Sequence, residues 1–248
     1  MSIVIQLPNR GASNIYHWFI YIVSELKDIL NKNNDVHLIY PTIDNILDYQ
    51  EITLKKLIPP QNIHRSRDTL PPHFIELDLP CVINSYFYDY YKSYYQFLRL
   101  IFPPPIISPN INITYISRND SFYSPHHKGI ATRCVINENE LVEHFGIIPH
   151  SFSFMPFNDQ LNLFQSSKYI ISSHGSALTY ALFMHPDSII IELNSNPISF
   201  PHFKHICDLL GLKIIQIFCT CLDKNESIIA PIDIISNIIN ANGLYYRV

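Results

Sequence analysis

Short, largely apolar segments alternate with helical patterns along most of this chain, and this alternation restricts the possible fold more than any other feature. In the second half, three such segments read YIISS, SIIIEL and KIIQIF, and a stretch with helical spacing separates each from the next. Strands that are apolar on both faces are typical of a parallel sheet covered by helices on both sides. The sequence therefore predicts an α/β fold built on parallel sheets.

The alternation occurs in two blocks. In the first block we predict strands at 3–7, 36–40, 74–79 and 81–87, and helices at 14–30, 42–58 and 90–102. In the second block we predict strands at 112–118, 151–157, 169–173, 188–193 and 213–218, and helices at 138–146, 158–167, 177–185, 200–211 and 231–240. Between them lies Pro103-Pro104-Pro105, which can continue neither a helix nor a central strand. We predict two Rossmann-like domains, residues 1–108 and 109–248, facing a central cleft.

Composition narrows the class of protein. The 248 residues carry a formal net charge of -4 and no basic stripe, so nucleic acid is not an expected partner. The N-terminus lacks the basic start of a signal peptide, and no apolar run is long enough for a membrane span, so we expect a cytoplasmic protein. Five cysteines without a C-x-x-C pattern indicate reduced thiols. The Ile- and Asn-rich composition indicates an AT-rich genome, and hence a microbial or large-DNA-virus source.

Polar residues follow the apolar segment 169–171 at its carboxyl end, where open α/β sheets bind ligands. These residues are Ser172, Ser173, His174, Gly175 and Ser176. A helix that begins near Ser176 would direct free backbone N–H groups at this turn. Gly175 would let the backbone approach an anion, and His174 and Ser176 could donate to phosphate oxygens. The turn thus predicts a phosphate-binding site, although a simple strand-to-helix turn with a capping serine is an equally good interpretation.

Three charged residues extend this prediction. Arg118 follows the strand predicted at 112–118, and Arg133 follows one loop later. Because arginine pairs with a diphosphate through two parallel hydrogen bonds, both are candidate diphosphate ligands. Glu192, near the end of the strand predicted at 188–193, could accept hydrogen bonds from ribose hydroxyls. Together these residues predict a site for a nucleoside diphosphate.

Two other classes fit less well. A dinucleotide-binding Rossmann protein would need G-x-G-x-x-G after its first strand, and only six glycines occur in the chain. A serine hydrolase would need a G-x-S-x-G turn, which the sequence also lacks.

An ordered series of motifs resembles glycosyltransferase family 61. The series is Asn14-Ile-Tyr-His17-Trp18, Arg118, Arg133, Asn137-Glu138, Glu140-Leu141, Asp159-Gln160, Leu163-Phe164, His174-Gly-Ser-Ala-Leu178, Phe183-Met184 and Ile191-Glu-Leu193. The resemblance implies a GT-B fold and inverting transfer from a UDP-sugar to a glycan or protein hydroxyl. It also implies that no metal or other cofactor is needed, which agrees with the lack of a well-placed Asp-x-Asp. Arg118, Arg133 and the helix N-terminus at Ser176 would then stabilise the leaving UDP.

The sequence departs from the family at one position near the N-terminal motif. The family commonly carries an acidic residue one helical turn after the histidine of its N-terminal motif, and here this position is Tyr21. His17 therefore becomes the candidate base, with Glu25 as the second choice. Because of Tyr21 and the short chain, a catalytically inactive relative that binds a nucleotide sugar or a glycan is the alternative.

Aromatic residues in the first block are candidate acceptor contacts, because aromatic faces stack on sugar rings. They are Trp18, Tyr21 and Tyr90, the last within the tyrosine-rich stretch 85–97. Core packing is the competing interpretation for Trp18 and for the tyrosines. His126 and His127 are adjacent, which suits a polar loop better than a metal site.

Overall fold

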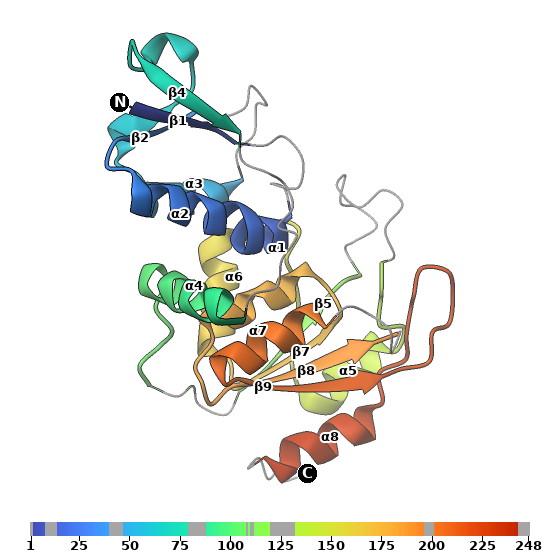
Figure 1. Ribbon diagram of the computed structural model, residues 1–248. Helices are drawn as coiled ribbons and strands as arrows, with labels where there is room; N and C mark the ends of the chain where they lie inside the picture. Colours follow the sequence, from blue (N-terminus) through green and yellow to red (C-terminus); the bar gives the residue numbers. More distant parts are fainter. Residues whose placement is uncertain are drawn as a thin grey trace. The chain divides into compact units, whose positions relative to one another are not determined.

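The computed structural model describes residues 2–7, 14–39, 47–78, 88–107, 109, 112–119, 132–195 and 201–242, and at 77, 78 and 88–90 this description covers the backbone alone. The chain forms two compact units, Met1–Tyr94 and Tyr95–Val248 (Figure 1). The division falls inside helix α4 (Tyr88–Ile101), upstream of the proline run. The boundary that we predicted at residue 108 stays a prediction. Each unit contains a parallel sheet, which confirms the α/β class.

The described residues of unit 1 form four parallel strands in the order β3-β2-β1-β4, and the strand predicted at 81–87 lies outside them. The strands are β1 (Ser2–Gln6), β2 (Val36–Ile39), β3 (Ile63–His64) and β4 (Phe74–Asp78). The helical segments are α1 (Ile15–His17), η1 (Trp18–Ile22), α2 (Val23–Lys32), α3 (Asp48–Leu57), η2 (Pro60–Asn62) and η3 (Arg67–Thr69). This strand order is that of a Rossmann half, and the order reverses between β1 and β4. Ligands of such sheets bind beside this switch point, at the carboxyl ends of the strands.

The first helix of unit 1 differs from the single α-helix that we predicted at 14–30. Residues Trp18–Ile22 form a π-helical turn between α1 and α2. Helical spacing predicts one apolar face for this segment, made of Ile15, Phe19, Ile22, Val23, Leu26 and Leu30. Phe19, Ile22, Val23 and Leu26 are buried, and Ile15 and Leu30 are half-buried. Asn14 begins the helix, and its side-chain oxygen accepts a hydrogen bond from the backbone N–H of Tyr16 (2.9 Å).

A chain of hydrogen bonds fixes the end of β3 against β2. His37 Nδ1 lies 2.8 Å from His64 Nε2, and His37 Nε2 lies 3.0 Å from Asp35 Oδ1. His64 Nδ1 in turn lies 2.9 Å from the hydroxyl of Thr69. Burial, and then the nearby His37, lower the pKa of His64. The sequence analysis did not foresee this contact, because the two histidines are 27 residues apart.

In unit 2 the part of the chain that the structure describes forms five parallel strands in the order β6-β5-β7-β8-β9. The strands are β5 (Ile113–Ser117), β6 (Pro149–Ser151), β7 (Tyr169–Ser173), β8 (Ile189–Asn194) and β9 (Lys213–Phe218). The helices are α5 (Glu138–Phe145), α6 (Phe157–Ser166), η6 (Ser176–Phe183), α7 (His202–Leu210) and α8 (Ile232–Ala241), together with the C-terminal part of α4. Counted within the sheet, the order is 2-1-3-4-5, a doubly wound arrangement whose switch point lies between β5 and β7.

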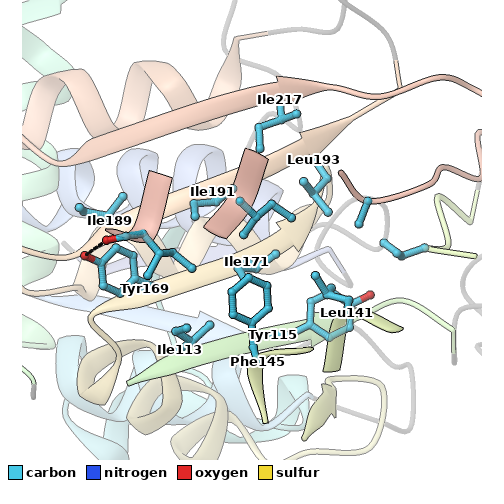
Figure 2. Packing of buried hydrophobic residues seen from close by; sticks show 14 of the residues in the cluster. Ile113, Tyr115, Leu141, Phe145, Tyr169, Ile171, Ile189, Ile191, Leu193 and Ile217 are labelled. Atoms are coloured by element: carbon cyan, nitrogen blue, oxygen red, sulfur yellow. Dashed lines mark hydrogen bonds between the residues drawn. The ribbon is translucent and has the colours of Figure 1, made fainter. Parts of the chain in front are cut away.

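Side chains of the sheet in unit 2 alternate between its two faces. Ile171, Ile191 and Leu193 pack with Leu141 and Phe145 of α5 in the main apolar core, which Figure 2 shows. Ile235 and Ile239 of α8 close the same core. Because neighbouring residues of a strand point to opposite faces, Ser172 and Glu192 lie on the other face of the sheet. This second face carries Ser172 and Glu192, whereas Ser173 lies on the same face as Ile171.

Two elements predicted in unit 2 were partly wrong. The strand predicted at 151–157 ends at Ser151, because Phe152–Met155 form a turn closed by a hydrogen bond from Met155 N to Phe152 O (3.3 Å). The side-chain amide of Gln160 donates to the carbonyls of Phe152 and Met155 and holds this turn. The helix predicted at 177–185 exists, but η6 is a 3-10 helix.

Arg99 fixes the C-terminal end of η6. Its Nε donates to the carbonyl of Leu182 (2.9 Å), and its Nη2 donates to the carbonyl of Met184 (3.0 Å). Burial lowers the pKa of this guanidinium. We expect Arg99→Ala to destabilise unit 2 by about 2–3 kcal/mol, because it removes two charge-assisted hydrogen bonds and leaves carbonyls unsatisfied.

This change in stability should lower Tm by about 4–10 °C in a thermal melt. Gln96→Ala is the control, because Gln96 is an exposed residue of the same helix. An Arg99→Ala protein with the same Tm as wild type would contradict the capping role.

Candidate functional site

Arg118 and Gly175 meet at the switch point of unit 2. Arg118 follows β5 and Gly175 follows β7, and these two strands are neighbours across the point where the strand order reverses. A Cβ atom placed on Gly175 would lie 1.8 Å from Nη1 of Arg118. The φ of Gly175 is 176°, which any residue can adopt, so its backbone conformation does not require glycine. The glycine is needed because the guanidinium occupies the space of a side chain.

The guanidinium of Arg118 is oriented by a neighbouring loop. Its Nε donates to the carbonyl of Thr132 (2.8 Å), and the Sγ of Cys134 lies 3.5 Å from the carbonyl oxygen of Arg118. The Nη edge is thereby directed to the first residues of η6. A 3-10 helix leaves its first backbone N–H groups without partners inside the helix. A guanidinium and such N–H groups together form a site suited to an anion.

The imidazole of His174, the residue before Gly175, contacts a buried carboxylate. Its Nδ1 is 2.6 Å from Oε1 of Glu192, and the Nε2 of Gln216 donates to Oε2 of Glu192 (2.7 Å). Phe203 of α7 packs against the imidazole with a centroid distance of 5.1 Å. The Glu192 side chain is 1% exposed and the His174 side chain 14%. Both carboxylate oxygens of Glu192 are thus occupied, so its predicted contact with a ribose stays a prediction and its observed contact is with His174.

Arg133 is held by an ion pair. Its Nε lies 2.6 Å from Oε2 of Glu226, which also accepts a hydrogen bond from Ser195 (3.3 Å). Arg133 and Glu226 both have positive φ, 54° and 58°, a region that non-glycine residues rarely adopt. Since Thr132, which holds Arg118, directly precedes Arg133, the two arginines belong to one edge of the sheet. The sequence analysis missed Glu226, because nothing in its local pattern marks it as a partner.

The remaining residues predicted for this site lie close to the same turn. Ser173 ends β7 and is buried, and Ser176 begins η6 and is partly exposed. The sequence analysis gave no role to Gln216, although a polar residue inside the apolar segment KIIQIF was a usable signal. The register of β8 and β9 pairs Gln216 with Glu192 and explains their contact.

In unit 1, His17 and Tyr21 lie in the first helix after β1. Their ring centroids are 5.5 Å apart, and Tyr16 packs edge-on against both rings. The strand-to-helix connection starts at the carboxyl end of β1, beside the switch point of this sheet. His17 is exposed, but partial burial of its ring lowers its pKa.

Glu25 lies eight residues after His17. Two turns of an α-helix take 7.2 residues. The π-helical turn between them has more residues per turn than an α-helix. Eight residues therefore make close to two full turns here, which places Glu25 on the side of His17. Burial and the nearby Asp28 raise the pKa of Glu25, and Lys32 acts in the opposite direction. Both candidate bases therefore share one side of this helix.

The three predicted acceptor contacts differ in their surroundings. Trp18 is fully buried and packs edge-on against Tyr49, which favours the core interpretation. Tyr21 is partly exposed. Tyr90 lies in α4 at a position where the description covers the backbone alone, whereas Tyr91, Tyr94 and Tyr95 are buried in core positions. His126 and His127 lie outside the described residues.

Within the described ranges, no three His, Cys, Asp or Glu side chains are grouped so that they could hold a metal ion. None of the described helices combines the length and apolar character of a membrane span. Four cysteines lie in the described part of the chain, and all four are free thiols.

Comparison with known proteins gives the family. The sequence profile described as Glycosyltransferase 61 matches residues 15–191, which is more than half of the chain. The chain belongs to glycosyltransferase family 61. The match includes His17, Arg118, Arg133, His174 and Gly175, and it confirms the resemblance seen in the sequence motifs.

Three curated relatives resemble parts of the chain. A beta-1,2-xylosyltransferase of Oryza sativa subsp. japonica is 26% identical over 110 residues, which are 40% of this chain and 21% of the relative. A beta-1,2-xylosyltransferase of Arabidopsis thaliana is 25% identical over 118 residues, 41% of this chain and 22% of the relative. An EGF domain-specific O-linked N-acetylglucosamine transferase of Drosophila melanogaster is 29% identical over 102 residues, 39% of this chain and 17% of the relative. The chain thus matches about a fifth of the length of these relatives.

Some residues of the family 61 motifs hold the fold. Both side-chain amide atoms of Asn137 bond to the backbone of Ala230, at 3.0 and 2.8 Å. Glu138 accepts hydrogen bonds from the hydroxyls of Tyr115 (2.8 Å) and Ser117 (2.6 Å) at the end of β5. These contacts fix the strand end from which Arg118 extends.

Proposed function

We propose that this protein is an inverting, metal-independent glycosyltransferase that moves a sugar from a UDP-sugar to a hydroxyl of a glycan or glycoprotein. The meeting of Arg118, Gly175 and His174 at the switch point of unit 2 is the observation that carries this proposal. A guanidinium, an imidazole and a helix N-terminus suit a diphosphate better than a neutral ligand. The names of the family 61 relatives, which are xylosyl- and N-acetylglucosaminyltransferases, support the same class of reaction.

The proposal includes a GT-B arrangement, in which unit 2 binds the donor and unit 1 binds the acceptor. A base in unit 1 removes the proton of the acceptor hydroxyl, and the oxygen attacks the anomeric carbon of the sugar. The bond from this carbon to the diphosphate breaks on the opposite side, so the configuration inverts. The leaving UDP carries the negative charge, which Arg118, Arg133 and the N–H groups of η6 stabilise. His17 is the base that we propose, with Glu25 as the second candidate.

A donor screen tests this function. Thermal shifts would be measured with UDP, GDP, CMP and their sugars, with and without EDTA, and UDP release would be followed in parallel. We expect stabilisation by UDP or a UDP-sugar that survives EDTA, because a ligand that binds only the folded state raises its stability. Stabilisation that EDTA abolishes would contradict a metal-independent site. The configuration of the product, determined by NMR, tests inversion.

The donor site itself is tested by Arg118→Ala and His174→Ala. We expect each variant to bind UDP about ten-fold more weakly, since each loses a charge-assisted contact to the diphosphate. Calorimetry measures the affinity, and His144→Ala is the control, because His144 is bonded to Ser236 (2.8 Å) on an exposed surface of α5 and α8. Unchanged UDP affinity in both site variants would place the diphosphate elsewhere.

A further inference from the structure

The contact between His174 and Glu192 determines which ring nitrogen faces a ligand. Because a carboxylate oxygen can only accept, Nδ1 carries a hydrogen whether the ring is neutral or charged. Nε2 is therefore the atom whose character changes. It accepts a hydrogen bond in the neutral ring and donates one in the imidazolium form. An anionic ligand on the Nε2 side can be hydrogen-bonded by the imidazolium form alone.

Glu192 is built into the sheet with both of its side-chain oxygens in contact. It lies in β8, fully buried, with Gln216 donating to one oxygen and His174 contacting the other. A buried negative charge is stable only beside a positive charge or hydrogen-bond donors. Of these two partners, only His174 can become positive. The burial of Glu192 thus favours a proton on His174.

Two other ionisable groups, Cys207 and Arg118, do not titrate between pH 7 and 9. Cys207 of α7 is a buried thiol, and burial raises its pKa to about 12, with further increases from Glu192 and Asp208 and opposing effects of Lys204 and Arg99. This thiol stays neutral between pH 7 and 9. Arg118, whose guanidinium lies against Gly175, keeps its charge throughout this range. Neither group would therefore give a pH dependence of ligand binding between pH 7 and 9.

We propose that Glu192 is a positioning residue that holds His174 as an imidazolium, so that its Nε2–H binds the diphosphate of the ligand. This inference rests on the proposed function and adds a pH dependence to the donor site. Affinity for the diphosphate falls as the pH rises and Nε2 loses its hydrogen. Glu192→Gln keeps an acceptor for Nδ1–H but removes the negative charge. The fall in affinity then begins at a lower pH.

The experiment compares UDP affinity between pH 7 and 9 in wild type, Glu192→Gln and Glu143→Gln. The range starts at pH 7 because the terminal phosphate of UDP titrates near pH 6. We expect Glu192→Gln to bind UDP about ten-fold more weakly at pH 7.5 and to lose affinity about one pH unit earlier than wild type. Glu143, an exposed residue of α5, is the matched control, and its variant should follow wild type. A uniform loss at every pH, or no loss, would overturn the proposal.

A second measurement separates this inference from the proposed function. If wild type binds no UDP at any pH, the donor class is wrong, and ring ¹⁵N NMR of the ligand-free protein still tests the pair. His174→Gln assigns the signals. We expect Nδ1 of His174 to remain protonated from pH 6 to 9, and Nε2 to lose its hydrogen at a lower pH in Glu192→Gln than in wild type. Loss at the same pH in both proteins would overturn the inference.

Discussion

Replacing His17 by alanine is expected to reduce sugar transfer by about 10²–10⁴-fold while UDP affinity stays at the wild-type value. His17 lies at the end of α1 in unit 1, whereas the proposed diphosphate site lies in unit 2. Loss of a base removes the group that takes the acceptor proton, but it removes no contact to the donor. Initial rates of UDP release at saturating donor, together with UDP affinity from calorimetry, separate these two effects.

The pH profile of wild type adds a second test of His17. Only a neutral imidazole can accept a proton, and burial lowers the pKa of His17 from its ordinary value of 6.5. At saturating donor, transfer should therefore rise with pH through a value below 6.5 and then level off. Protonation of His17 at lower pH removes the base, so activity is lost on the acid side.

His73→Ala is the control for His17, because His73 is an exposed histidine of the same unit. If His17→Ala retains full transfer, His17 is not the base. In that case Glu25→Gln should abolish transfer, because the pKa of Glu25 is raised from 4.5 by burial and by Asp28. If the fall of transfer at low pH disappears in only one of these two variants, the residue replaced in that variant is the group that titrates.

Gly175→Ala is expected to weaken UDP binding by about 10- to 100-fold with little change in Tm. The new Cβ would lie 1.8 Å from Nη1 and 3.0 Å from Cζ of Arg118, so the guanidinium must move. An arginine side chain is flexible at its end, and the backbone of Gly175 is extended, so the fold tolerates the methyl group. One displaced charge-assisted contact corresponds to about 1.5–3 kcal/mol of binding.

A double-mutant cycle checks whether the effect of Gly175→Ala acts through Arg118. In the Arg118→Ala protein there is no guanidinium for the new Cβ to displace. Gly175→Ala should therefore lower UDP affinity much less there than in wild type. Additive losses in the double variant would show that the two residues act independently. A large decrease in Tm for Gly175→Ala alone would mean that the glycine is required for folding and not for the ligand.

The sequence was sufficient for the class of fold and for the residues that surround the turn of unit 2. Apolar segments such as YIISS and SIIIEL became strands of a parallel sheet that are buried on both faces. The motif around His174 was recognised because its residue types follow a strand directly. Local pattern was also enough for the apolar face of the first helix, where Phe19 and Leu26 are buried.

Tertiary structure decided the partners of these residues, since they come from segments far apart in the chain. Glu192 is 18 residues and Gln216 42 residues from His174, and only the register of β7, β8 and β9 brings them together. Local sequence likewise does not show the ion pair of Arg133 with Glu226, which is 93 residues away. Nor does it show that the Arg118 guanidinium occupies the space of a side chain at position 175. The π-helical turn at Trp18–Ile22 was also missed, because periodicity fixes which face is apolar and not how the backbone hydrogen bonds are spaced. Residue types along the strands thus determined the sheet, and strand register determined how side chains such as His174 and Glu192 at its carboxyl edge are held.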